Sequence, residues 1–273
     1  MDLNALSLTH VIPFPSFARR SVVASLGDEV FVAAYLKGVE VYDTGTIFQR
    51  CLSNPGLGLK CFGLAACAHN NCLYASNLVT SSIYRVDLSG SSAVKTWSVG
   101  SHPRGLSVNK AHNVVVACYG ANKLLEYTTD GSLVREISLQ QAGLTNPCHA
   151  VQLSTGDYVV SQRTSPGVVS VVGVDGRVVH RYDQSQPSNV GQMNHPAGLA
   201  VTKDDNILVA DCRNHRILFM NSSLSSSQVL ALSVDKGIQG PLGLCLDESR
   251  GRLYVSERSG GRVLVFDSKA VNH

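Results

Sequence analysis

The sequence predicts an all-β fold, a six-bladed β-propeller in which an N-terminal strand closes the last blade. A unit of three short strand-like segments recurs six times, and successive copies are 41 to 49 residues apart. Such a period without helical segments is typical of four-stranded propeller blades. A spare alternating segment also precedes the first copy, whereas the last copy lacks a fourth strand. We therefore expect one domain over residues 1–273.

The clearest copy is the fifth, with strands expected over 194–201, 206–211 and 216–220. These segments are rich in β-branched and aliphatic residues and are separated by turn residues. Similar copies occupy 240–267 and 102–127, and weaker ones occupy 22–41, 63–84 and 150–169. In every copy, the last residue of the second strand and the first residue of the third are five apart. The aligned pairs are Ala33/Gly38, Asn77/Ser82, Cys118/Lys123, Gln162/Gly167, Asp211/Arg216 and Glu257/Arg262.

Fourth strands are expected over 93–99, 133–137, 178–182 and 228–232. The spare segment over 6–11 alternates apolar and polar residues, so we assign it as the outer strand of the sixth blade. This arrangement would close the ring and pair an otherwise open sheet edge.

The start of the chain has no secretory signal pattern, and no apolar run is long enough to span a membrane. Cys67, Cys72, Cys118 and Cys245 lie in apolar strand-like runs, and no cysteine pair has CxxC spacing. We expect free thiols and a reducing, cytoplasmic compartment.

Residues 194–220 contain His-Pro-x-Gly-Leu-Ala-Val, Ile-Leu-Val-Ala-Asp and Asn-His-Arg-Ile. This unit resembles the NHL repeat, and the other copies match it with decreasing quality. WD and kelch repeats are disfavoured, because Trp97 is the only tryptophan and Gly-Gly doublets do not recur. The resemblance implies a recognition domain, since many family members lie at the C-terminal end of larger ubiquitin-ligase-type proteins and several bind RNA or protein. The chain is then a candidate part of a larger multidomain protein.

Two acid–arginine pairs flank short loops, Asp211 with Arg216 and Glu257 with Arg262. They could contact a ligand, but their recurrence at one position favours structural ion pairs. Small residues recur on the predicted innermost strands, where strands converge and larger side chains would collide. These small residues are Gly63, Gly105, Ala150, Gly198 and Gly243.

Three histidines, His102, His149 and His195, occur at or just before three consecutive inner strands. They could hold zinc, as in a related propeller family of amidating lyases, or could belong to the turn signature of the repeat. A metal-dependent lyase or hydrolase with a site in the central channel is therefore the alternative function. No nucleophile motif or acid–base constellation is present, so we expect no enzyme activity and no cofactor.

Loop charges separate by face in the predicted propeller. The face with the second-to-third-strand turns receives a charge of +6, and the opposite face receives −6. Aspartate is common in tight turns, which explains the acidic face but not the basic one. The candidate ligand-binding residues of the basic face are Tyr35, Lys37, Arg104, Tyr119, Lys123, Arg163, Arg213 and Arg258.

A basic face with aromatic residues suits single-stranded RNA, whereas an acidic protein segment or peptide needs only the charge. Both partners remain open, and no membrane partner is expected. A passive scaffold that uses the acidic face or the rim is a further hypothesis.

Overall fold

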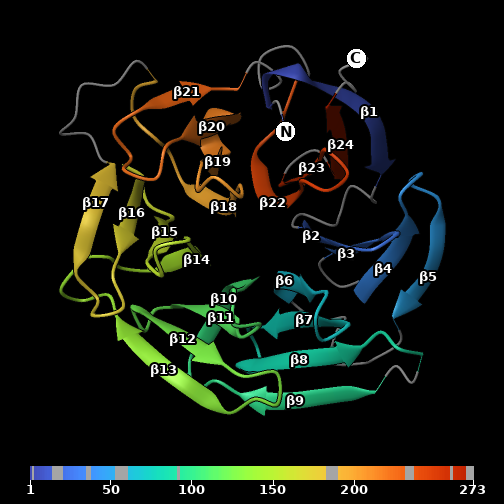
Figure 1. Cartoon of the computed structure of the whole chain (residues 1–273), viewed down its shortest axis with the longest axis horizontal. Coiled ribbons are helices and arrows are strands. Elements are labelled where there is room, and N and C mark those ends of the chain that lie inside the picture. The colour runs from blue at the N-terminus through green and yellow to red at the C-terminus, as the bar shows by residue number, and fades with distance from the viewer. Residues whose placement is uncertain are drawn as a thin grey trace.

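Six antiparallel sheets of four strands surround a central axis, as Figure 1 shows. This computed structural model describes residues 1, 3–13, 21–34, 38–52, 61–90, 93–182, 190–230, 237–258 and 261–268. In the first five sheets, the order of strands along the chain is also their order from the axis to the rim. The predicted six-bladed β-propeller is therefore confirmed.

The first three blades are regular four-stranded meanders. Their strands are β2 (Ser21–Leu26), β3 (Glu29–Ala34), β4 (Gly38–Asp43) and β5 (Phe48–Leu52); β6 (Cys61–Cys67), β7 (Cys72–Asn77), β8 (Ser82–Asp87) and β9 (Val94–Ser98); and β10 (His102–Val108), β11 (Val114–Tyr119), β12 (Lys123–Tyr127) and β13 (Leu133–Ser138).

The last three blades repeat this pattern, and a short 3-10 helix, η2 (Cys212–Asn214), lies in a loop of the fifth. Their strands are β14 (Pro147–Gln152), β15 (Tyr158–Gln162), β16 (Val168–Val172) and β17 (Val178–Tyr182); β18 (Pro196–Val201), β19 (Ile207–Asp211), β20 (Arg216–Met220) and β21 (Ser227–Val229); and β22 (Pro241–Asp247), β23 (Arg252–Glu257) and β24 (Arg262–Ser268).

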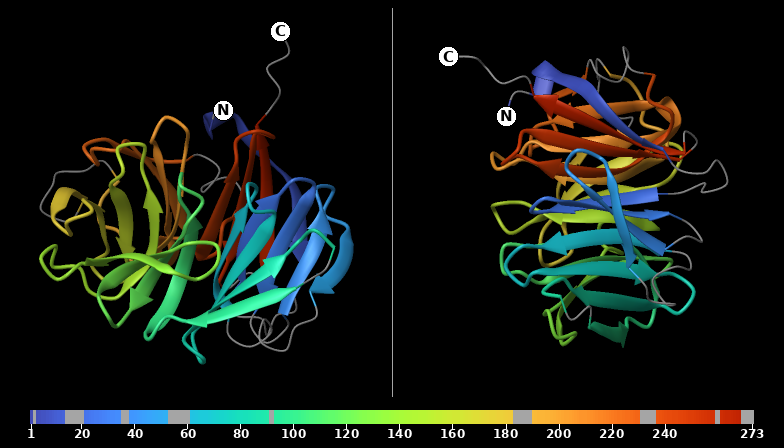
Figure 2. Two further views of the ribbon diagram at one scale, coloured as in Figure 1. Left: turned by 60° about the horizontal axis from the view of Figure 1, so that its bottom comes forward. Right: turned by 90° about the vertical axis from the view of Figure 1, so that its right-hand side faces the viewer.

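The N-terminal strand completes the sixth blade. Strand β1 (Leu6–Pro13), which follows a 3-10 helix over Leu3–Ala5, pairs antiparallel with β24. Figure 2 shows the two strands side by side although they come from opposite ends of the chain. Ile12 is fully buried and packs against Val263, Val265 and Tyr254. This strand was predicted over 6–11, and it extends to Pro13.

Among the described residues, the core consists of six apolar clusters, each shared by two neighbouring blades. In the cluster between the third and fourth blades, for example, Leu124 and Ile137 pack against Tyr158 and Val160. Each blade therefore buries apolar side chains against both of its neighbours, so we expect the closing strand to stabilise the whole ring.

The innermost strands approach one another closely. A Cβ atom on Gly63 would lie 2.1 Å from the carbonyl oxygen of Arg104, and one on Gly105 would lie 2.5 Å from that of Cys148. The expected packing role of these glycines is confirmed, and the colliding group is the backbone of the next blade. Serine hydroxyls add hydrogen bonds between blades: Ser76 donates to the Arg104 carbonyl at 2.7 Å and Ser161 to that of Ala197 at 2.6 Å.

Some elements differ from the prediction. Strand β5, with the sequence FQRCL, was not predicted because it is polar and mostly exposed. All eight cysteines lie in the described ranges, and none of them forms a disulfide. Burial raises the pKa of the Cys61 thiol to about 12. Among the residues placed by the structure, no helix is both long and apolar enough to cross a bilayer.

Candidate functional site

The antiparallel order of the strands places the loops on two opposite faces. The start of each inner strand and the turn between the second and third strands lie on the same face. This face carries Arg104 at the start of β10, Arg163 between β15 and β16, Arg213 in η2 and Arg258 after β23. We call it the basic face. Tyr35 and Lys37, also expected there, lie outside the described residues.

The two acid–arginine pairs form within the fifth and sixth blades. Arg216 Nε lies 2.7 Å from Asp211 Oδ2, and Arg262 Nε lies 2.7 Å from Glu257 Oε2. Both carboxylates are fully buried. Each also accepts a backbone N–H from the connection that leads into its blade, from Asn194 to Asp211 and from Gln239 to Glu257. These pairs therefore fix the loops of the basic face.

Four arginines of the basic face have no carboxylate partner in the part of the chain that the structure describes. They are Arg104, Arg163, Arg213 and Arg258. Lys123 differs, because its Nζ lies 2.9 Å from Glu136 Oε2. The sequence did not indicate this pairing, which reduces the positive charge that Lys123 offers a ligand.

The Arg104 guanidinium lies over the ring of Tyr119, 3.8 Å from its centroid, and 5.9 Å from that of Phe62. Such stacking holds the guanidinium in place and leaves its in-plane N–H groups available to an acceptor. One face of the Tyr119 ring is thus occupied, although the sequence suggested this ring as a stacking platform for bases.

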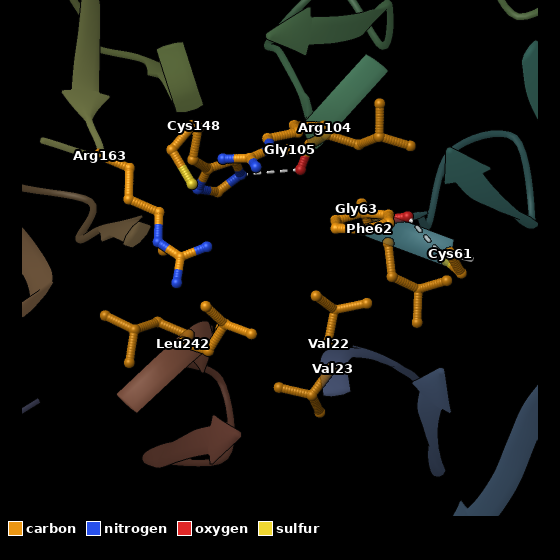
Figure 3. Close-up of a pocket in the computed structure, with 16 residues that line it drawn as sticks. Val22, Val23, Cys61, Phe62, Gly63, Arg104, Gly105, Cys148, Arg163 and Leu242 are labelled. Carbon is orange, nitrogen blue, oxygen red and sulfur yellow. Dashed lines mark hydrogen bonds between the residues drawn. The ribbon is translucent and has the colours of Figure 1, made fainter. Parts of the chain in front are cut away.

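A cavity of about 70 Å³ opens where the inner strands begin, at the centre of the basic face. Figure 3 shows Arg163 pointing into this space above an apolar wall that includes Val22, Val23 and Leu242. Nε of Arg104 and Nε of Arg163 are both buried and have no hydrogen-bond partner among the described residues. A second cavity of about 260 Å³, lined by the later parts of the inner strands, continues toward the opposite face.

His149 borders both cavities, but its ring is fully engaged. Nε2 lies 2.9 Å from the Leu106 carbonyl oxygen, and Nδ1 accepts the Leu199 backbone N–H at 3.0 Å. These bonds require the neutral imidazole with its proton on Nε2, and burial lowers the pKa of His149. The side chain therefore ties the inner strands of three blades together and has no free nitrogen for a metal ion.

The other two histidines do not complete a metal site with His149. His102 is exposed. His195 Nδ1 lies 3.1 Å from Asn194 Oδ1. Within the described ranges, no three histidine, cysteine, aspartate or glutamate side chains converge on one point. Burial, and next the positive charges of Arg213, Arg163 and Arg258, lower the pKa of His195, so the charges of these arginines all act on this imidazole.

On the opposite face, several carboxylates accept hydrogen bonds from backbone N–H groups of the turns. Asp43 accepts the Ile47 backbone N–H at 2.9 Å, and Asp205 accepts that of Ser154, from the neighbouring blade, at 2.8 Å. Other acids on this face form ion pairs: Asp28 and Asp247 both pair with Arg250. Local turn and ion-pair roles therefore account for much of this acidity.

A family model for the NHL repeat matches residues 193–218. The match covers β18, β19 and the start of β20, and it contains the Asp211–Arg216 pair. The remaining blades repeat the same four-stranded unit around one axis. The chain is therefore a six-bladed β-propeller with an NHL repeat in its fifth blade.

No curated protein sequence matches this NHL propeller. Solved structures resemble it in fold. Virginiamycin B lyase from Staphylococcus aureus is 10% identical, with a TM-score of 0.67 over 96% of this chain and 99% of that one. A nidogen/laminin complex gives 18% identity and a TM-score of 0.70 over 89% and 90%. A protein of unknown function from Bacteroides thetaiotaomicron gives 11% and 0.72 over 97% and 72%.

These identities are low enough that the likeness concerns the fold alone. The similar structures include a lyase and a complex of two proteins, so the fold alone does not determine the chemistry of this propeller. Sequence reasoning named Arg104 and Arg163 but missed Phe62, Cys148 and Leu242 beside them. Their sequence positions could have indicated this grouping. All five residues lie on the basic face, either where the chain enters an inner strand or in a turn between the second and third strands.

Proposed function

We propose that this NHL propeller is a non-enzymatic recognition module whose basic face binds an acidic segment of a partner protein. The observation that carries the proposal is an imbalance of charge. The acids Asp211 and Glu257 are already bound by Arg216 and Arg262, whereas the four arginines of the basic face have no carboxylate partner in the described ranges. A surface of this kind attracts and orients an acidic partner.

Two features favour a protein partner over RNA. Arg104 covers one face of the Tyr119 ring, which limits stacking of bases there. The centre of the face opens into a cavity with an apolar wall, which offers little to a ribose or to the edge of a base. One of the similar solved structures is also a complex of two proteins, nidogen and laminin.

The proposal is tested by fluorescence anisotropy with a labelled oligoglutamate peptide and a labelled oligouridine, at about 50 and 200 mM salt. We expect oligoglutamate to bind and its affinity to fall at the higher salt concentration. Arg213→Glu and Arg258→Glu should each weaken binding at least tenfold. The matched control is Asp204→Lys, a charge reversal at an exposed residue of the opposite face, which should leave binding intact.

Loss of binding in Asp204→Lys, with binding retained in both arginine variants, would show that the wrong face has been assigned. Tight binding of oligouridine without binding of oligoglutamate would replace the protein partner with RNA.

A further inference from the structure

The cavity at the centre of the basic face combines an apolar wall with a cationic rim. Its wall is apolar and includes Val22, Val23, Leu64, Leu242 and Leu244. Its rim carries two guanidinium groups, those of Arg104 and Arg163, as Figure 3 shows for Arg163. A ligand that satisfies both must present an anionic group next to an apolar one.

The two arginines are prepared to donate hydrogen bonds. Nε of each is buried away from water, and no acceptor reaches it from the described residues. A buried donor without an acceptor is unfavourable, so such donors in a native structure point to a missing partner. Arg104 is fixed over Tyr119 at 3.8 Å, so one of the two guanidinium groups is already ordered.

No nearby carboxylate of the described chain can take this role. Asp211 and Glu257 are held by Arg216 and Arg262 in the neighbouring blades. Burial, and next the charges of Arg213, Arg163 and Arg258, lower the pKa of His195, so these three cations act on one region of the basic face. An external anion is therefore the group that this rim can accept.

The size of the cavity restricts the apolar group. At about 70 Å³ it offers less room than the cavities of about 150 Å³ that take benzene, so a short aliphatic side chain suits it better than a nucleobase. A planar carboxylate matches the donor geometry of a guanidinium. His149 offers no further donor, because Nε2 and Nδ1 are both bonded to the backbone.

At the C-terminus of a peptide, the carboxylate and the side chain of the last residue are attached to the same Cα atom. An internal aspartate or glutamate offers only one or two methylene groups beside its carboxylate, and these cover less of an apolar wall than a branched aliphatic side chain does. We infer that the channel mouth binds the C-terminal carboxylate of a partner peptide that ends in a short aliphatic residue. Arg104 and Arg163 donate to the carboxylate, and the last side chain enters the cavity. This inference rests on the proposed function, since acidic residues before the terminus would then lie over Arg213 and Arg258.

The test uses fluorescein-labelled acidic pentapeptides that end in valine, leucine or isoleucine, each as the free acid and as the C-terminal amide. We expect at least one free acid to bind the unaltered protein at least tenfold more tightly than its amide. Arg163→Gln should remove this preference, whereas Arg177→Gln on the opposite face, where Arg177 lies near Asp175, should retain it. Free isovalerate in excess should compete if the cavity also takes small acids, and its failure to compete would assign the site to peptide termini.

Equal binding of acids and amides, combined with weaker binding in Arg213→Glu, would overturn the inference and leave the proposed function intact. If neither the pentapeptides nor oligoglutamate bind, both this inference and the proposed function are overturned. The acid–amide comparison uses the unaltered protein, so it stands even if Arg163→Gln folds poorly. Leu242→Trp, which fills the cavity without touching either arginine's charge, provides a second variant and should also remove the preference.

Discussion

Replacement of Arg216 by alanine should destabilise the fold strongly, because it leaves a buried charge without its counter-ion. Arg216 lies 2.7 Å from Asp211 and also donates to the carbonyl oxygens of Val190 and Gln192, at 2.6 and 3.1 Å. Loss of one partner of a buried pair typically costs ~3–5 kcal/mol. Asp211 keeps hydrogen bonds from Asn194 and Asn214, so we expect the lower end, about 3 kcal/mol.

For chains of this size, each kcal/mol lowers the melting temperature by roughly 2–4 °C, which predicts a decrease of about 6–12 °C in Arg216→Ala. The assay is thermal unfolding followed by circular dichroism. Arg177→Ala is the control, since Arg177 is 78% exposed and lies 3.7 Å from Asp175, and it should change the melting temperature by about 1 °C or less.

The double variant Asp211→Asn/Arg216→Ala distinguishes this explanation from a simple loss of packing. It removes the buried charge together with its partner, so it should be more stable than Arg216→Ala alone. A decrease below about 2 °C in Arg216→Ala, or a double variant less stable than the single one, would refute the reasoning.

Three further predictions concern the ring. Ile12→Ala on the closing strand, where the side chain is fully buried, should cost ~2–5 kcal/mol in denaturant unfolding, and Val11→Ala, at 41% exposure, should cost far less; equal effects would contradict closure by β1. Gly105→Ala should destabilise the fold more than Gly45→Ala does. A Cβ at position 105 would lie 2.5 Å from the Cys148 backbone, whereas one at position 45 would lie 3.2 Å from the Asp43 side chain. The reverse order of stabilities would contradict the close packing of the inner strands. Burial lowers the pKa of His149, so below the usual histidine pKa of ~6.5 the unfolded chain binds more protons than the folded one, and the free energy of unfolding should fall as the pH decreases from about 7 to 5. His149→Gln keeps a donor and an acceptor without titrating in this range, so its slope should be shallower, and an unchanged slope would argue against this role.

Much of the fold follows from local sequence pattern. The five-residue spacing between second and third strands appears directly as the pairings of Asp211 with Arg216 and of Cys118 with Lys123. In the first blade Ala33 instead pairs with Val39, and in the fourth Gln162 pairs with Val168, each one residue later than expected. Strand β5 was missed because Arg50 and Gln49 make it polar, and an outermost strand needs little apolar surface.

The candidate site was less predictable, since it depends on contacts between blades rather than within them. The sequence placed Arg104 and Arg163 on one face but could not show that they meet at a single cavity. It offered His149 as a metal ligand, whereas the structure shows both ring nitrogens bonded to the inner strands of the neighbouring blades. Pairing of Lys123 with Glu136 likewise requires knowledge of the cross-strand register.

The claim that the basic face is the binding surface is tested most directly by hydrogen exchange with mass spectrometry, with and without an acidic peptide that ends in a free carboxylate. Backbone amides of the loops around Arg163, His195, Arg213 and Arg258 should exchange more slowly in the complex. Those of the opposite-face turns at Asp43, Asp205 and Ser249 should not change. Slower exchange confined to the opposite-face turns would contradict the account.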